Sequence, residues 1–158
     1  YPDANQLADM AKSAARVVKL FGFDPKVAFL SHSTFGQPVT DRTKRISDAV
    51  EILKKSNVDF KFDGEMQPDV ALEEIYKELY PFSEIVGSSN VLIMPSQHSA
   101  AISYKMIKSM SRAKVIGPLL IGLGLPIEIA PLRSSTSEII NLASIAAYSA
   151  DVIDYKKN

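Results

Sequence analysis

"KVAFLSHSTFGQPVTD", residues 26–41, decides the fold class because it joins a strand, a polar loop and the start of a helix. The run "KVAFL" follows Pro25 and is short and apolar, which is typical of a buried strand. Ser, Thr, Gly and Pro residues then mark a loop. Beyond the loop, apolar residues recur at helical spacing, at Ile46, Ala49, Val50 and Leu53. A strand followed by a loop and a helix predicts an α/β fold.

The remainder of the chain continues this alternation. We expect further helices over residues 7–21, 70–80, 102–110 and 136–151. The last of these is apolar on most sides, so we expect it to be buried. We expect further strands over residues 58–62, 90–95, 114–122 and 126–130. This order predicts one three-layer α/β/α domain with a largely parallel sheet over residues 1–158.

Composition narrows the class of protein. The 158 residues are 46% hydrophobic, and 18 basic residues balance 18 acidic ones, so nucleic acid and anionic membranes are poor partners. The absence of cysteine excludes disulfides, thiol catalysis and cysteine zinc sites, and it fits a cytoplasmic protein. The chain opens "YPDANQL" without a methionine, which suggests a domain excised from a longer protein.

Acidic and amide side chains alternate in "FKFDGEMQPDVALEE", residues 60–74. Counted from Asp63, oxygen ligands occupy positions 1, 3, 5, 7 and 12, as in an EF-hand calcium loop. Position 6 is Pro68 where that loop needs glycine, and a strand precedes it instead of a helix. We therefore predict no calcium site here.

The loop "SHSTFGQP" follows a predicted strand, where ligands bind in open α/β sheets. Ser33, Thr34 and the backbone near Gly36 are able to bind a phosphate there, although the same residues are ordinary in turns. The Gly-Lys-Ser/Thr ending of a Walker loop is absent. His32 and His98 belong to no ligand-spaced cluster.

A second polar segment, "RSSTSE" at residues 133–138, precedes the last predicted helix. Ser135 and Glu138 have capping-box spacing, which gives Glu138 a sufficient structural role. Arg133 either meets an anionic ligand at that helix N-terminus or is solvated.

Five segments together resemble the C-terminal half of phosphate acetyltransferases. They occur in the family's order: "VAFLSHSTFG", "FDGEMQPDVAL", "SSNVLIMPSQHSAAISYK", "IGPLLIGLGLPIEI" and "SEIINLASIAAYSA". The resemblance implies a phosphotransacetylase-like fold over nearly the whole chain. It also implies that an acidic motif lies near the ligand cleft, formed by Asp63, Glu65, Gln67 and Asp69.

Departures from the family argue against catalysis. Active members carry an adjacent Ser-Arg pair and a downstream aspartate for acyl transfer, and these positions hold Pro131, Leu132 and Glu138. Arg133 stands one position late, where the family has glycine. Proline has no hydroxyl and leucine cannot stabilise phosphoryl charge. Three more family residues, two asparagines and a glutamine, are replaced by His98, Ala101 and Ile121.

These departures resemble the acetyltransferase-like C-terminal region of large bacterial NADP-dependent malic enzymes. That resemblance implies a parent that decarboxylates malate oxidatively to pyruvate, with NADP and a divalent metal (Mg or Mn) held by an upstream part. It implies no cofactor within this chain, acetyl-CoA as an allosteric effector, and a homo-oligomer of at least two copies.

Three functions stay open: an acetyl-CoA-sensing regulatory domain, part of an active phosphate acetyltransferase, and a structural dimerisation module. We favour the first, because a decayed cleft has no evident need for both the polar loop and the acidic motif. We expect the loop after "VAFLSH", the acidic motif and the Arg133 region to share one cleft. The candidate acetyl-CoA or phosphate ligands are Ser33, Thr34, Gly36, Asp63, Gln67, Arg133, Ser134 and Glu138.

Overall fold

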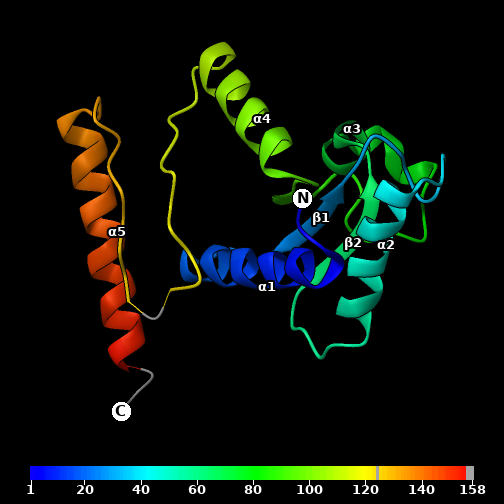
Figure 1. Cartoon of the computed structure of the whole chain (residues 1–158), viewed down its shortest axis with the longest axis horizontal. Helices are drawn as coiled ribbons and strands as arrows, with labels where there is room; N and C mark the ends of the chain where they lie inside the picture. The colour runs from blue at the N-terminus through cyan, green and yellow to red at the C-terminus, as the bar shows by residue number, and fades with distance from the viewer. Residues whose placement is uncertain (124, 156–158) are drawn as a thin grey trace. The chain divides into compact units, whose positions relative to one another are not determined.

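A computed structural model describes residues 1–123 and 125–155 of the chain (Figure 1). The chain forms two compact units, Tyr1–Lys105 and Met106–Asn158, and each is described by itself. In chain order the elements are α1 (Ala4–Leu20), β1 (Lys26–Leu30), α2 (Asp41–Lys54), β2 (Lys61–Met66), α3 (Pro68–Leu72), the 3₁₀ helix η1 (Glu74–Glu78), β3 (Val91–Ile93), α4 (Gln97–Met110) and α5 (Thr136–Tyr155). Helix α4 begins in the first unit and ends in the second.

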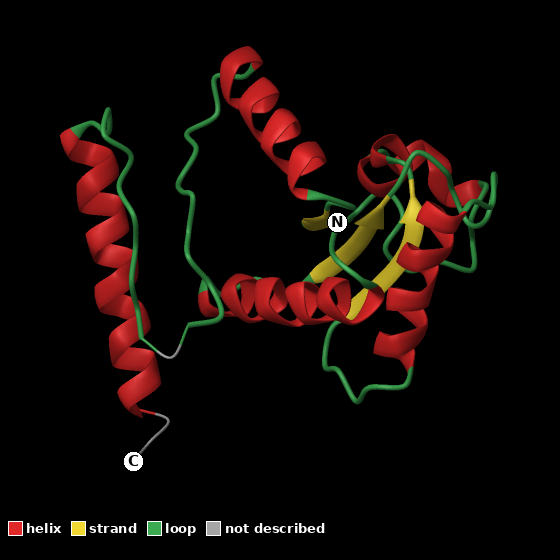
Figure 2. Cartoon of the chain, viewed as in Figure 1, coloured by secondary structure: helices red, strands yellow, loops and turns green. Residues whose placement is uncertain are grey.

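The first unit is built around a parallel three-stranded sheet in the order β2-β1-β3 (Figure 2). Strand β1 is central because its apolar residues are buried on both faces, as expected for a parallel sheet. Ala28 lies opposite Asp63 of β2 and Leu92 of β3. The predicted α/β fold with a parallel sheet is confirmed.

Side chains of β1 alternate between two apolar layers. Val27 and Phe29 pack with residues of α1 and α2, and Val91 and Ile93 of β3 join the same cluster. Ala28 and Leu30 face the opposite side, where Val70 and Ala71 of α3 cover them together with Met66, Ile85 and Val86. The first unit therefore has three layers of its own.

Capping side chains fix where α1 and α2 begin. Asp3 accepts the backbone N–H of Gln6, and the Gln6 side chain accepts that of Asp3. Thr40 and Thr43 exchange the equivalent pair of bonds at the start of α2. These reciprocal bonds satisfy amides that have no partner inside the helix.

Two element predictions are wrong in detail. The strand predicted at residues 58–62 begins at Lys61 and continues through Asp63 and Glu65 to Met66, because the backbone pairs with β1 there. The helix predicted at residues 70–80 is split into α3 and η1. Glu73 between them has extended dihedral angles (φ −102°, ψ 123°), which interrupts the helix.

The largest differences lie in the second unit. Residues 114–122 and 126–130 were predicted as strands, but their described residues form no β-ladder. Pro118 and Pro126 lack a backbone N–H, and no other strand is present in this unit for them to pair with among the described residues. Helix α5 was predicted to be buried, yet up to Asp151 only Leu142 is buried. Its exposed apolar residues include Ile139, Ile140 and Tyr148.

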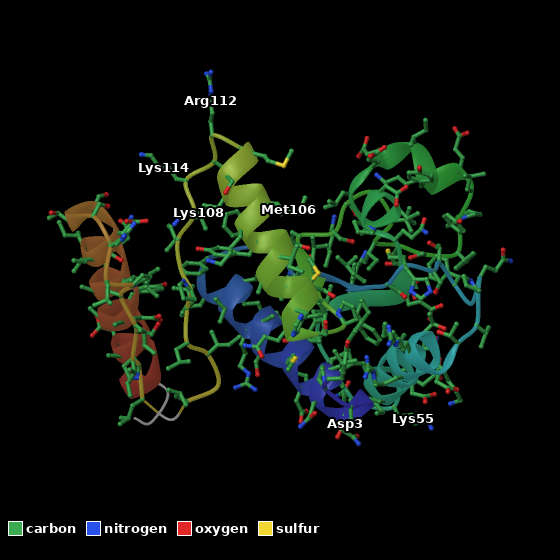
Figure 3. The ribbon with its side chains drawn as sticks, turned by 45° about the horizontal axis from the view of Figure 1, so that its top comes forward. Asp3, Lys55, Met106, Lys108, Arg112 and Lys114 are labelled. Atoms are coloured by element: carbon green, nitrogen blue, oxygen red, sulfur yellow. The ribbon has the colours of Figure 1, made fainter. Side chains whose placement is uncertain are left out.

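The C-terminal part of α4 is also exposed. Met106 and Lys108 stand on its surface, and Arg112 and Lys114 follow the end of the helix and point outwards (Figure 3). The described residues include no helix that is long and apolar enough to span a membrane.

Candidate ligand-binding site

The polar loop after β1, residues 31–39, lies at the carboxyl end of the sheet, where β2 also ends. Two backbone bonds join the loop to β2 beyond the regular ladder. The Ser31 N–H donates to the Met66 carbonyl at 2.9 Å, and the Phe35 N–H donates to the Glu65 carbonyl at 2.8 Å. Of the three segments predicted to share one cleft, these contacts bring the loop and the acidic motif together.

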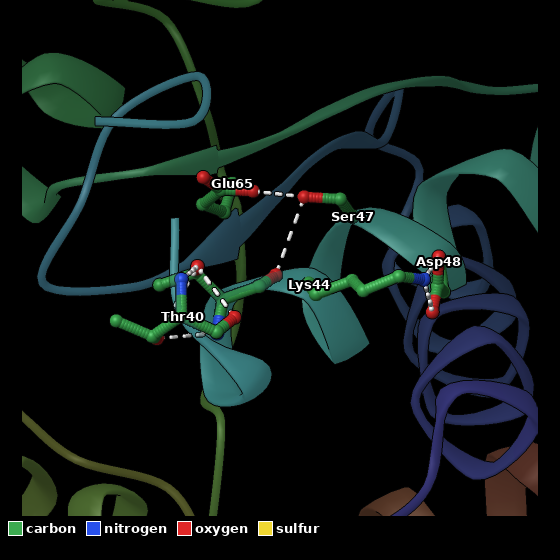
Figure 4. Close-up of polar contacts among 6 residues, drawn as sticks. Thr40, Lys44, Ser47, Asp48 and Glu65 are labelled. Carbon is green, nitrogen blue, oxygen red and sulfur yellow. Dashed lines mark hydrogen bonds and ion pairs between the residues drawn. The ribbon is translucent and has the colours of Figure 1, made fainter. Parts of the chain in front are cut away.

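Glu65 is the centre of this junction. Its side chain is buried, and its Oε1 accepts the Ser33 hydroxyl at 3.0 Å and the Gly36 N–H at 2.7 Å. Its Oε2 accepts the hydroxyl of Ser47 on α2 (Figure 4). One carboxylate thus connects the loop, β2 and α2, and both of its oxygens accept hydrogen bonds from the protein itself.

Gln67 forms the second connection between the motif and the loop. Its backbone N–H donates to Thr34 Oγ1 at 3.1 Å, and its side-chain amide donates to the His32 carbonyl at 2.8 Å. Ser33, Thr34, Gly36 and Gln67 are therefore brought together as predicted from the sequence, and the contacts between them are internal.

Asp63 and Asp69 have local partners. Asp63 is in the middle of β2, and its carboxylate accepts the N–H of Gly64 at 2.9 Å. Asp69 accepts the hydroxyl of Tyr76 at 3.0 Å, which raises the pKa of Tyr76. These two carboxylates thus accept bonds from groups close to them in the chain, whereas Glu65 and Gln67 bond to the loop.

A groove of about 460 Å³ opens at the carboxyl ends of β1 and β3. Leu30, Ile46, Met94 and Ile102 give it an apolar floor. Its polar lining contains no carboxylate and consists of Tyr1, Ser31, His32, Arg42, Arg45, Ser96, His98, Ser99 and Ser103. This volume is in the range of small-molecule sites, and the charge of the lining favours an anionic ligand.

The second unit contains a smaller cavity of about 120 Å³. Arg133, Ser134 and Glu138 line it, together with Pro131 and Lys108. All three candidate residues of this segment are therefore neighbours. The Ser134 N–H donates to the Pro131 carbonyl at 3.0 Å, which closes the turn before α5.

Glu138 caps α5 as the sequence predicts. Its carboxylate accepts the N–H and the hydroxyl of Ser135 at 2.8 and 2.9 Å, and the Glu138 N–H donates back to Ser135 Oγ. The Ser135 N–H, and next its hydroxyl, lower the pKa of Glu138, and Lys108 at 3.6 Å acts in the same direction. An anionic Glu138 opposes binding of a second anion in this cavity.

The candidate residues thus form two groups, one in each unit. Whether Arg133 and the loop at residues 31–39 share a cleft stays a prediction. Sequence reasoning missed Arg42 and Arg45 of the groove, although their spacing of three residues on a helix after a ligand loop is a usable signal. It also left Glu65 out of the candidate residues, although Glu65 holds the loop in place.

A family model described as phosphate acetyl/butaryl transferase matches residues 1–147. The chain belongs to the phosphate acetyl/butaryl transferase family. Two solved structures of family proteins share its fold. A phosphotransacetylase from Streptococcus pyogenes is 35% identical with a TM-score of 0.90, over 94% of this chain and 46% of that one. The EutD phosphotransacetylase from Staphylococcus aureus is 30% identical with a TM-score of 0.86, over 95% and 47%.

Two kinds of curated protein contain sequences similar to this family domain. The NADP-dependent malic enzyme of Rhizobium meliloti (strain 1021) is 48% identical over 149 residues, which are 94% of this chain and 20% of that protein. The phosphate acetyltransferase of Bacillus subtilis (strain 168) is 35% identical over 94% of this chain and 46% of its own length. The chain therefore spans about a fifth of the malic enzyme and less than half of the transferase.

Proposed function

We propose that this phosphate acetyl/butaryl transferase-family domain is a non-catalytic, acetyl-CoA-sensing part of an NADP-dependent malic enzyme. The groove of the first unit carries the proposal, because it combines an apolar floor with an arginine- and histidine-lined wall. An acyl-CoA presents the same combination, an apolar acyl end and a phosphate-rich end. The similarity to the malic enzyme of Rhizobium meliloti supports the choice of parent.

The second unit supports a binding role over a catalytic one. Pro131 lines the cavity beside Arg133, and Leu132 next to it is fully exposed. Neither side chain is able to donate a hydrogen bond to a reacting phosphoryl group. The competing function, part of an active phosphate acetyltransferase, is favoured by the family match and by the Bacillus subtilis relative.

The proposal divides the chemistry between two parts of the parent. NADP and the divalent metal, Mg or Mn, belong to the upstream part that oxidises and decarboxylates malate. This domain contributes the acetyl-CoA site and contacts between copies in a cytoplasmic homo-oligomer. Nucleic acid and membranes are not partners in this proposal, in keeping with the balanced charge of the chain.

We expect acetyl-CoA to change the malate KM or kcat of the full-length protein by at least about fivefold, as coupling between sites typically does. The measurement follows the absorbance of reduced NADP against acetyl-CoA concentration, with free acetate at equal ionic strength as control. Calorimetry of acetyl-CoA with the 158-residue chain tests binding separately. Binding without any change in malate activity would reject the sensor, and absence of both effects would favour a structural module.

We also expect the chain to self-associate through its second unit. Exposed apolar residues follow one another along its extended segment and α5: Ile116, Leu120, Ile121, Leu123, Leu125, Ile127, Ile129, Ile139 and Ile140. Such a run is unusual for a solvent-facing surface. Sedimentation at micromolar concentration should show a dimer or a larger species. We expect each contact between copies to bury at least about 1,000 Å², as specific interfaces do. A monomer would count against the oligomerisation role.

A further inference from the structure

Two guanidinium groups lie near the same aromatic ring, and both of their residues line the groove of the first unit. Arg42 and Arg45 lie three residues apart on α2, and their Cζ atoms are 5.8 and 5.5 Å from the centre of the Tyr1 ring. Neither forms an ion pair with a carboxylate in the part of the chain that the structure describes. Two like charges near one ring repel each other, and an anion between or beside them would lower that repulsion.

Arg45 has a donor that the protein leaves unused. Its Nη2 donates to the Pro95 carbonyl at 3.3 Å, which fixes the side chain against the end of β3. Its Nε is buried and has no hydrogen-bond partner among the described residues. A buried polar atom of this kind calls for an explanation, and an anion in the groove would supply one if the Arg45 side chain turned its Nε towards the groove.

The remainder of the groove suits an extended anion. Ser96 and Ser99 lie at the start of α4, with their hydroxyl oxygens 3.0 Å apart, and His32 and His98 line the same space. The lining contains no carboxylate that would repel an anion. Arginine forks bind phosphate oxygens in pairs, and two arginines match a group with two linked phosphates better than a single phosphate.

We propose that Arg42 and Arg45 form a clamp for the diphosphate group of the ligand in this groove. The identity of that ligand as an acyl-CoA rests on the proposed function, whereas the clamp itself rests on the two arginines. Inorganic pyrophosphate is therefore the direct probe, because it carries the diphosphate without the acyl or nucleoside parts. Acetyl-CoA is the second probe and tests the source of the diphosphate.

The experiment is calorimetric titration of the 158-residue chain with pyrophosphate and then with acetyl-CoA. We expect Arg45→Gln and Arg42→Gln each to weaken pyrophosphate binding at least about tenfold, the loss typical of one charge-assisted contact. Arg16→Gln is the matched control, because it removes the same charge from an exposed position on α1 outside the groove lining. We expect it to bind pyrophosphate as the unchanged chain does.

Two further readouts keep the test decisive. The first is the Nε–Hε resonance of Arg45, which should shift when pyrophosphate is added. The second is the circular dichroism spectrum of Arg42→Gln, which should match that of the unchanged chain because Arg42 is exposed. Equal losses in Arg16→Gln and Arg42→Gln would reduce the effect to general charge and reject the clamp. Failure to bind pyrophosphate at millimolar concentration would also reject it.

The outcomes also separate the clamp from the proposed function. If the clamp binds pyrophosphate but acetyl-CoA leaves malate activity unchanged, the clamp stands and the sensor is wrong. If acetyl-CoA changes malate activity in Arg42→Gln and Arg45→Gln as much as it does in the unchanged parent, the sensor stands and the clamp is wrong.

Discussion

The full-length protein, mixed with acetyl phosphate and coenzyme A, is expected to form no measurable acetyl-CoA. Acyl transfer needs groups that orient the thiol and stabilise charge on the transferring acyl phosphate. The resemblance to the family places its Ser-Arg pair at Pro131 and Leu132, and Leu132 is fully exposed with no polar atom on its side chain. Loss of one charge-stabilising donor costs about 10²–10³ in rate, and the hydroxyl is missing as well. The measurement is thioester absorbance.

The phosphate acetyltransferase of Bacillus subtilis serves as the positive control for this assay. Robust turnover by the protein that is abolished by Arg133→Ala or Glu138→Ala would reject the sensing function and support an active phosphate acetyltransferase. Turnover that survives both changes points to a contaminant. Glu138→Ala also removes the cap of α5, so a parallel thermal melt is needed for that variant.

Gly64→Ala is expected to destabilise the first unit by about 3 kcal/mol or more, from backbone strain and overpacking together. Gly64 has φ +146°, and an added Cβ would lie 2.8 Å from both the Cβ and the carbonyl oxygen of Phe29. Phe29 is fully buried in the central strand, so it cannot move aside. The measurement is denaturant unfolding followed by circular dichroism.

Gly22→Ala is the matched control for this change. Gly22 also has a positive φ, +82°, but nothing lies within 4 Å of its added Cβ. We expect a loss of only about 1 kcal/mol, the cost of a left-handed alanine. If both variants lose the same stability, the close approach of β2 to Phe29 is not the cause.

How far the sequence predicts this fold depends on the kind of residue in each element. Strand β1 was predicted because its residues are apolar and fully buried, which leaves a pattern in the sequence. Most of β2 was missed, because Asp63, Gly64 and Glu65 are typical of a loop. Pairing with β1 holds them in a strand, and Glu65 is buried only because Ser33, Gly36 and Ser47 supply its donors. Such donors come from distant parts of the chain.

The site shows the same division. Ser33, Thr34, Gly36 and Gln67 could be grouped from the sequence because each follows a strand end. Arg42 and Arg45 leave only the weaker signal of their spacing on a helix after that loop, because the sequence does not show that Arg45 reaches Pro95, 50 residues away along the chain. The apolar run at residues 114–130 was read as strands because local composition is all that a single sequence offers. A strand also needs a neighbour to pair with, and the described part of this unit provides none.

The Glu65 junction has a consequence for the entropy of binding. A polar loop that is ordered only by its ligand loses backbone freedom at the moment of binding, about 1–2 kcal/mol for each residue fixed. Here Glu65 holds Ser33 and Gly36, and Gln67 holds Thr34, through hydrogen bonds within the protein. The loop therefore loses this backbone entropy when the domain folds, not when a ligand binds. A ligand that contacts this loop is bound with little loss of chain entropy, and modest contacts suffice for useful affinity.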